Sequence, residues 1–425
     1  MYGIYSFLLF VALLVYFPGN FLRTKIGKKE NLYLRERLGM RLPTAKSERP
    51  SIWIHAVSVG EVLSLRRLIA ELKAKHPSWP IYLSTLTSAG YRVARQMVSE
   101  VEEVLFVPLD FGWVAKRFFS ALRPRLFVLA ESEYWPNLLR QARRSCRFVI
   151  LINGRISERS YQRYCRMKGL VRPVLNNIDQ FLVQTEKDRD RLECLGVPHN
   201  RIEVAGNLKA DILLPEVKSE EKAARKAAFG LSDKDIVIVA GSTHQGEEEI
   251  ILRAFAKAKK GRPDIVLVMA PRHPERAAEV EKAVGKTGLR AMRRTLARAD
   301  KIWDVLILDT LGELAGFYAL ADLAFVGGSL VPHGGQNLLE PAYYAKPICF
   351  GKHMENFAAL ADDFVRLGAA RVVEGAEDLE TLFRMEDPIA LEEMGRRARE
   401  RLSSLQGATT RALRVIESRM QGVGE

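Results

Sequence analysis

The chain has 425 residues, which is more than one compact domain usually contains, so two domains with separate cores are expected. Hydrophobic residues make up 48% and charged residues 27% of the chain, a composition that excludes a collagen-like, low-complexity or broadly disordered protein. The formal net charge of +14 favours an anionic partner, but it does not distinguish nucleic acid, acidic lipid headgroups and a phosphorylated small substrate.

Metal and thiol chemistry are not indicated by the sequence. The four cysteines have no C-x-x-C or zinc-ribbon spacing, and the seven histidines form no H-x-x-x-H pair. We therefore expect reduced, inert cysteines and a chemistry that uses neither a metal nor a cofactor.

Residues 1–22 carry no charged side chain, and residues 4–17 are almost continuously apolar. A helix of that length would extend about 33 Å, just enough to cross a bilayer, although Pro18-Gly19 interrupts its end. A cleaved signal peptide would have positive charge before the apolar run, and there is none. Residues 23–49 instead carry a net charge of +6, which by the positive-inside rule places the following chain in the cytoplasm. The sequence predicts a membrane anchor in residues 1–22 and a basic juxtamembrane segment in 23–49; a core or docking helix is the alternative.

From residue 51 onward, short apolar β-rich runs alternate with longer amphipathic stretches, a rhythm typical of βαβ units on parallel sheets. One series of runs comprises residues 52–57, 81–85, 105–108, 126–129, 148–152 and 181–183, and a second comprises 236–240, 265–269, 305–308, 323–326, 348–350 and 371–373. We predict two Rossmann-like, doubly wound domains at residues 50–206 and 233–390, joined by a linker at 207–232. Residues 391–425 are expected to be helical and able to pack back on the N-terminal domain.

Ligands of open parallel sheets bind beyond the carboxyl ends of the strands, so the loops after these runs are the candidate sites. The first is 55–61, where Ser58-x-x-Glu61 matches a capping box, a structural role. In the functional interpretation, Glu61 is a carboxylate kept ionised near a helix N-terminus and ready to accept a proton, with Ser58 and Gly60 beside it. Both interpretations hold only if the Glu61 carboxylate stays accessible.

A second candidate loop spans residues 131–137 and places Glu131 and Glu133 beside an aromatic residue, a proline and Asn137. A solvated turn is the structural alternative. Arg155 follows the next strand and begins a strongly basic stretch that ends at Arg172. Such a stretch is either a solvated helix face or a site for lipid phosphates.

The loops of the second domain suit a nucleotide. Ser242 and Thr243 follow its first strand and offer hydroxyl and N–H groups to a phosphate. Arg272 follows the next strand, where a guanidinium suits phosphate recognition and a surface ion pair is the alternative. The densest signal lies in 327–342, where glycines permit close backbone approach to a ligand and an acid can accept hydrogen bonds from ribose hydroxyls. Its candidate residues are Gly334, Gly335, Asn337 and Glu340.

Taken together and in this order, the motifs resemble the 3-deoxy-D-manno-octulosonic acid (Kdo) transferase family over nearly the whole chain. The likeness is carried by the apolar N-terminus and by residues 33–39, 55–61, 131–137, 241–244, 271–276, 309–314 and 337–341. Two departures are modest: residues 84–90 lack one threonine of the pattern, and Gly154 replaces a usual alanine.

The resemblance implies an α/β fold of the GT-B glycosyltransferase type, with two Rossmann-like domains facing a cleft. It also implies inverting, metal-independent transfer of Kdo from CMP-Kdo to a lipid A precursor, lipid IVA, at the cytoplasmic face of the bacterial inner membrane. Glu61 would be the general base, and Glu131 and Glu133 would shape the acceptor pocket or brace the loop of Glu61. The CMP site would comprise the C-terminal candidates above together with Gly312 and Glu313.

Two other interpretations remain open. One is another GT-B sugar-nucleotide transferase or a nucleotide-sugar 2-epimerase. The other is a membrane-attached nucleic-acid-binding or scaffold protein that uses the +14 charge, although no nucleic-acid-binding module is present and we expect no nucleic-acid partner.

Overall fold

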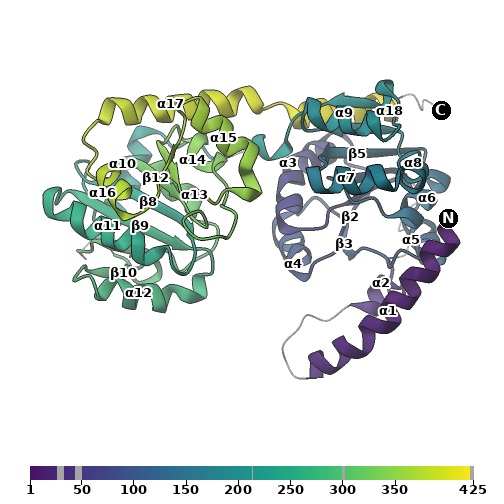
Figure 1. Cartoon of the computed structure of the whole chain (residues 1–425), viewed down its shortest axis with the longest axis horizontal. Helices are drawn as coiled ribbons and strands as arrows, with labels where there is room; N and C mark the ends of the chain where they lie inside the picture. Colours follow the sequence, from purple (N-terminus) through teal and green to yellow (C-terminus); the bar gives the residue numbers. More distant parts are fainter. Residues whose placement is uncertain (26–32, 44–49, 213, 299–301, 422–425) are drawn as a thin grey trace. The chain divides into compact units, whose positions relative to one another are not determined.

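The computed structural model describes residues 1–25, 33–43, 50–212, 214–298 and 302–421, without the side chains of residues 15–25 and 421. The chain divides into two compact units: unit 1 comprises Met1–Asp211 and Leu405–Glu425, and unit 2 comprises Ile212–Ser404 (Figure 1). The linker expected at 207–232 is therefore shared between the units, most of it belonging to unit 2.

Unit 1 is built on a seven-stranded sheet with the order β3-β2-β1-β4-β5-β6-β7 and parallel pairing throughout. The strands are β1 (Ser51–His55), β2 (Ile81–Thr85), β3 (Glu103–Phe106), β4 (Pro124–Ala130), β5 (Phe148–Gly154), β6 (Gln180–Val183) and β7 (Ile202–Val204). The helices are α1 (Tyr2–Lys25), α2 (Leu34–Arg37), α3 (Val59–Lys75), α4 (Ser88–Met97), α5 (Gly112–Leu122), α6 (Pro136–Ser145), α7 (Glu158–Arg166), α8 (Lys168–Leu175), α9 (Glu186–Cys194) and α18 (Ala408–Gln421). Two 3-10 turns, His199–Arg201 and Leu208–Ala210, flank β7.

Successive residues of the central strands enter two different cores, because helices cover both faces of the sheet. Ile52 and Ile54 of β1 pack on one face, whereas Trp53 packs on the other with Phe127 of β4. A strand buried on both faces has no polar side to alternate with, which explains why the sequence shows continuous apolar runs.

The chain leaves unit 1 after Asp211 and returns to it at residue 405. The Asp211 carboxylate accepts hydrogen bonds from the Gly407 and Thr409 N–H groups, at the start of α18. The side chains of Ala412 and Ile416 then pack into the core on the Ile52 face of the sheet. One buried carboxylate thus joins the exit and re-entry points of unit 1.

Unit 2 has a second seven-stranded sheet, in the order β10-β11-β9-β8-β12-β13-β14, again parallel at every pair. Its strands are β8 (Ile236–Thr243), β9 (Ile265–Pro271), β10 (Ala291–Arg293), β11 (Val305–Ile307), β12 (Leu323–Val326), β13 (Ile348–Phe350) and β14 (Arg371–Val372). Its helices are α10 (Ser219–Ala228), α11 (Glu248–Gly261), α12 (Ala277–Gly285), α13 (Leu314–Leu320), α14 (Leu339–Tyr343), α15 (Ala358–Arg366), α16 (Ala376–Phe383) and α17 (Pro388–Leu405). The prediction of two doubly wound parallel domains is confirmed.

The N-terminal helix α1 lies against the rest of unit 1 with one stripe of side chains, which includes Tyr2, Tyr5 and Ser6. Its other sides expose large apolar residues, among them Ile4, Phe7, Leu8 and Leu14. Within the part of the chain that the structure describes, no helix is both long enough and apolar enough to cross a membrane, so the predicted spanning anchor is not supported. Residues 26–32 and 44–49 of the basic juxtamembrane segment lie outside the described residues.

Candidate functional site

In unit 1, the strand order reverses between β1 and β4, since β2 lies on one side of β1 and β4 on the other. Glu61 follows β1, and Glu131 and Glu133 follow β4. The carboxyl ends of the two strands at such a reversal are the usual binding place in doubly wound sheets. The sheet topology therefore brings the two predicted loops together at one point.

Glu61 belongs to a capping box, as the sequence predicted. The Ser58 hydroxyl is the N-cap of α3; it accepts the Glu61 N–H at 3.4 Å and donates to Glu61 Oε1 at 2.9 Å. The Val57 N–H donates to Glu61 Oε2 at 2.8 Å. Both oxygens of the carboxylate are therefore held in a fixed orientation, with the side chain mostly buried.

The electrostatic surroundings of Glu61 suit proton transfer at neutral pH. Burial, together with the negative charges of Glu131 and Glu133, raises the pKa of Glu61 to about 7, against the opposing effect of the hydrogen bonds from the Val57 N–H and the Ser58 hydroxyl. Burial also raises the pKa of Glu133, followed by the charge of Glu131. A carboxyl group that titrates near pH 7 can both accept and release a proton under cellular conditions.

Glu131 has a left-handed backbone conformation, with φ 55°, and its carboxylate pairs with Lys209 at 3.3 Å. Lys209 lies just beyond β7, and the neighbouring Leu208 N–H is fixed by the Asn153 amide oxygen at 3.0 Å. Lys209 stands alone in a segment expected to be a linker, so no motif in the sequence indicates it as a site residue.

The other predicted acceptor residues have different surroundings. Asn137 is almost fully buried, and its amide donates to the Asp110 carbonyl and the Ser6 hydroxyl, so the side chain is engaged inside unit 1. Arg155 extends an exposed side chain, and its carbonyl accepts a hydrogen bond from the Ser132 hydroxyl. A Cβ on Gly60 would meet only Ser58 Oγ at 4.0 Å, which leaves the start of α3 open.

In unit 2, β8 lies between β9 and β12, so the strand order reverses at β8 and β12. The loops that follow β8, β9, β11 and β12 lie at one edge of the sheet, and the predicted donor residues lie in or beside them. Ser242 and Thr243, which were expected to follow the first strand, are instead the last two residues of β8 itself. Glu247 ties two of these loops together, since its fully buried carboxylate accepts N–H groups from His244 at 2.7 Å and from Gly328 at 2.6 Å. It also accepts the N–H groups of Ser329 and Leu330, each at 3.3 Å.

Three predicted donor residues in or near β8 and β9 differ in accessibility. The Thr243 hydroxyl is fully buried and bonds Glu248 at 3.2 Å, which in turn pairs with Arg276. Ser242 is partly exposed at a left-handed position, with φ 56°. Arg272 is exposed and forms no salt bridge within the described residues, so its guanidinium remains available for an anion.

The glycines of this region serve the protein's own packing. A Cβ on Gly334 would lie 2.5 Å from the Asn356 amide nitrogen, and one on Gly335 would lie 2.3 Å from Met354 Sδ. Both glycines therefore allow close approach to the segment after β13, and close approach to a ligand stays a prediction. Gly312 has φ 85° and no atom near its hypothetical Cβ, so only its backbone conformation favours glycine.

The acids Glu313 and Glu340 are both engaged locally. Glu313 accepts two hydrogen bonds from Arg294, at 3.1 and 2.9 Å. Glu340 accepts one from the Asn337 amide at 3.3 Å, and burial raises its pKa. Asn337 also accepts the Leu339 N–H at 3.1 Å, which orients it at the start of α14.

A cluster of histidines, not identified from the sequence, lies beside Arg272. The His244 ring stacks on His333 with centroids 4.2 Å apart and meets His273 edge-on at 6.2 Å. Burial, followed by His333, His273, Arg272 and Arg276, lowers the pKa of His244 to about 4. These basic neighbours would favour a bound anion. No group of three metal-ligating side chains occurs among the described residues.

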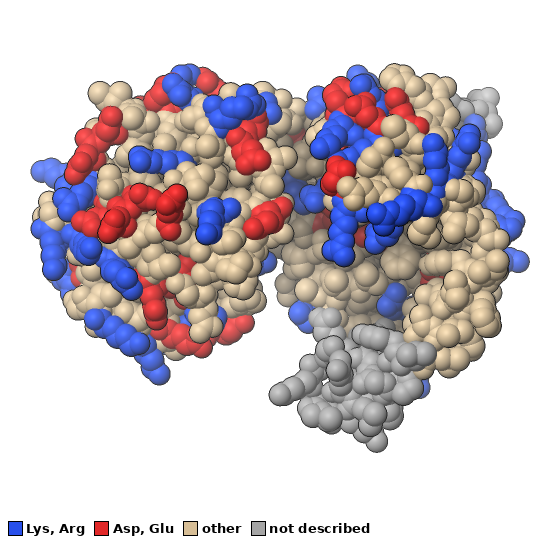
Figure 2. Space-filling model, in the orientation of Figure 1, with Lys and Arg blue, Asp and Glu red and all other residues tan. Residues whose placement is uncertain are grey.

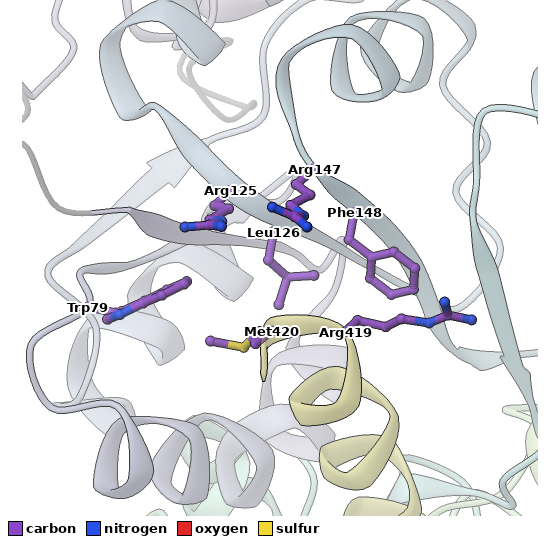
Figure 3. A pocket seen from close by; sticks show the side chains of 7 residues that line it. All are labelled: Trp79, Arg125, Leu126, Arg147, Phe148, Arg419 and Met420. Carbon is purple, nitrogen blue, oxygen red and sulfur yellow. The ribbon is translucent and has the colours of Figure 1, made fainter. Parts of the chain in front are cut away.

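A small pocket in unit 1 lies at the other edge of the sheet, where β4 and β5 begin (Figure 3). It is lined by Trp79, Arg125, Leu126, Arg147, Phe148, Arg419 and Met420. Its volume of about 10 Å³ is sufficient for roughly one water molecule. The pocket is therefore separate from the Glu61 region and too small for a sugar.

Two doubly wound parallel units with candidate sites at the carboxyl ends of their strands define the GT-B class. A solved structure of UDP-GlcNAc 2-epimerase from Neisseria meningitidis shares this fold with a TM-score of 0.58, covering 88% of this chain and 100% of that one. At 13% identity this likeness concerns the fold alone.

Comparisons of sequence give the family. The model of the 3-Deoxy-D-manno-octulosonic-acid transferase (kdotransferase) family matches residues 33–212. A 3-deoxy-D-manno-octulosonic acid transferase of Haemophilus influenzae is 32% identical over 393 residues, covering 90% of each chain. A bifunctional glycosyltransferase/methyltransferase of Fusobacterium nucleatum is 33% identical over 88% of this chain, which spans only 57% of that protein's length. This chain belongs to the 3-deoxy-D-manno-octulosonic acid transferase family and is a glycosyltransferase, which confirms the resemblance.

Proposed function

We propose that this protein transfers Kdo from CMP-Kdo to the lipid A precursor lipid IVA, with inversion and without a metal. The observation that carries this proposal is the Glu61 carboxyl group, oriented at the carboxyl end of β1 with a pKa near 7. Glu61 removes the proton from an acceptor hydroxyl as that oxygen attacks the anomeric carbon of Kdo. The bond from this carbon to the phosphate oxygen breaks, and CMP leaves with the bonding electron pair.

Unit 1 supplies the acceptor site in this proposal. Glu131 and Glu133 accept hydrogen bonds from the hydroxyls of the glucosamine disaccharide. Lysine and arginine side chains are prominent over α7 and α8 in Figure 2 and suit the phosphates of the lipid. The exposed members of this basic group are Arg155, Arg159, Arg163, Arg166, Lys168 and Arg172.

Unit 2 supplies the donor site. Arg272 and Ser242 bind the phosphate of CMP-Kdo, and Glu340, oriented by Asn337, accepts hydrogen bonds from the ribose. Gly334, Gly335, Gly312, Glu313 and the buried Thr243 maintain the surrounding loops.

The acceptor is a membrane lipid, so the enzyme acts at the cytoplasmic face of the inner membrane. The exposed apolar residues of α1, with Phe7 65% and Leu8 60% exposed, support attachment of this helix to inner-membrane lipids.

The decisive test is Glu61→Gln, assayed by mass spectrometry of lipid IVA after incubation with CMP-Kdo. Because glutamine keeps the shape but cannot act as the base, turnover should fall by about 10²–10⁴-fold while CMP affinity is retained. Glu71→Gln is a matched control, since Glu71 lies on the same helix and its ion pair among the described residues is with the surface residue Arg67. Near-normal turnover in Glu61→Gln with a lower melting temperature would limit Glu61 to capping and favour Glu131 or Glu133 as the base.

A further inference from the structure

The start of α6 is held by an acid from another loop. Asp110, which follows β3, accepts the N–H groups of Asn137 at 3.1 Å and Leu138 at 2.7 Å. These are two of the N–H groups that a helix N-terminus leaves without partners inside the helix. The Asn137 amide donates back to the Asp110 carbonyl at 2.6 Å. Asp110 and Asn137 together form what we call the α6 bracket, at the end of the loop that carries Glu131 and Glu133.

Two hydroxyl groups from α1 complete the α6 bracket. The Ser6 hydroxyl accepts the Asn137 amide at 3.0 Å. The Tyr5 hydroxyl interacts with the Asp110 carboxylate, and burial together with this carboxylate raises the pKa of Tyr5. Asp110 is 3% and Asn137 5% exposed, so water is excluded from most of this network. A buried polar group that loses its partner is costly, and the bracket therefore depends on α1 being in place.

The side chains of α1 that face the rest of unit 1, including Tyr5 and Ser6, are not those that membrane attachment alone requires. Attachment to a lipid surface uses apolar residues such as Ile4, Phe7 and Leu8, which α1 exposes on its other sides. It does not require a tyrosine and a serine matched to Asp110 and Asn137. These contacts fix where α6 begins, and hence where the preceding loop ends.

We propose that α1 is a positioning element of the acceptor site, acting through Tyr5, Ser6 and the α6 bracket on the loop of Glu131 and Glu133. This inference rests on the proposed function, in which that loop and Glu61 receive the acceptor. Neither Tyr5 nor Ser6 contacts the acceptor in this scheme; both act by holding the start of α6.

The test uses the full chain in detergent solution, so that attachment to vesicles does not limit the rate. Tyr5→Phe removes one oxygen atom and keeps the apolar ring. We expect kcat/KM for lipid IVA to fall by about 3- to 10-fold, because the start of α6 loosens, with no change in CMP affinity or in vesicle binding. The acid limb of the pH–rate profile should also move to lower pH. When the loop loosens, the negative charges of Glu131 and Glu133 repel the Glu61 carboxylate less, and the pKa of Glu61 falls.

Tyr2→Phe is the matched control. It removes the same atom from the same helix, but the Tyr2 hydroxyl accepts from the Asn177 amide at 3.1 Å, beyond α8. The contact of the Tyr2 ring with Arg140 of α6 is kept by phenylalanine. Tyr2→Phe should keep the parental kcat/KM and pH profile. Equal behaviour of the two variants, whether both are active or both impaired, would overturn the proposal.

A second pair of variants addresses the Ser6 contact. Ser6→Ala should reproduce the loss, and Ser6→Thr, which keeps the hydroxyl, should restore most of the activity. Failure of Ser6→Thr to exceed Ser6→Ala would count against the positioning role. The proposed function has a separate readout: an active Glu61→Gln enzyme would refute the assigned base, whereas a normal Tyr5→Phe enzyme with an inactive Glu61→Gln would refute the role of α1 alone.

Discussion

Both oxygens of Glu61 accept hydrogen bonds, and its pKa of about 7 lies well above the ordinary value for a glutamate. A base must be ionised to accept a proton, so the active fraction rises as the pH rises through this pKa. We expect kcat/KM to increase about tenfold per pH unit below pH 7 and to level off above it. The measurement is the pH–rate profile with saturating CMP-Kdo.

Glu131→Gln tests whether ionisation of Glu61 causes the acid limb of this profile, the rise in kcat/KM below pH 7. Removing the neighbouring negative charge makes ionisation of Glu61 easier, so the limb should move to lower pH even if the overall rate also falls. Glu71→Gln should leave its position unchanged. A limb that stays fixed in Glu131→Gln would show that another group titrates.

Contacts between residues that are close together in the sequence were predictable from local motifs, whereas contacts between distant residues were not. The Ser58-x-x-Glu61 capping box formed as expected because its partners are three residues apart. Lys209 and Glu247 were not found, because their partners Glu131 and Gly328 are 78 and 81 residues away in the chain. The burial of Thr243 and Asn137 also depends on residues brought near only by folding.

Among the elements, the loops after β8 and β12 are joined by the Glu247 carboxylate, beside the contacts of His244 with Gln336 and His333. Glu247→Gln replaces one accepting oxygen with an NH₂ group that would face backbone N–H donors. The loops should separate, and CMP affinity should fall by roughly 10-fold or more, consistent with the loss of about 1–3 kcal/mol when a buried group is left unpaired. Calorimetry with CMP measures the effect.

Glu249→Gln is the control for this variant, since Glu249 is an exposed residue at the start of the same helix, α11. CMP binding that is equally strong in both variants would show that the two loops hold their positions without Glu247.

The elements themselves were largely predictable. Strands buried on both faces produce continuous apolar runs, and each predicted run contains or overlaps a strand. The order of the strands in each sheet could not be predicted from any single apolar run, because it depends on which face of the sheet each connecting helix covers. The pattern of apolar runs did not predict the short edge strands β7 and β10, each three residues long.

For the whole molecule, the proposed attachment through α1 can be tested without shortening the chain. Phe7→Glu combined with Leu8→Glu places charge on the exposed apolar side of α1 and should reduce pelleting with phospholipid vesicles at high salt by at least about tenfold. Leu296→Glu, which changes an exposed leucine of unit 2, should not. Undiminished pelleting of the α1 variant would assign attachment to another surface.

The joining of residues 211 and 407–409 by one carboxylate has a consequence for synthesis on the ribosome. Unit 2 is an insertion in unit 1, so its whole sequence emerges before the strand-covering helix α18 is made. Until then, the apolar face that α18 covers lacks part of its core, including Ile416. Unit 2 can therefore be complete while unit 1 still awaits α18, so that unit 1 is completed after unit 2.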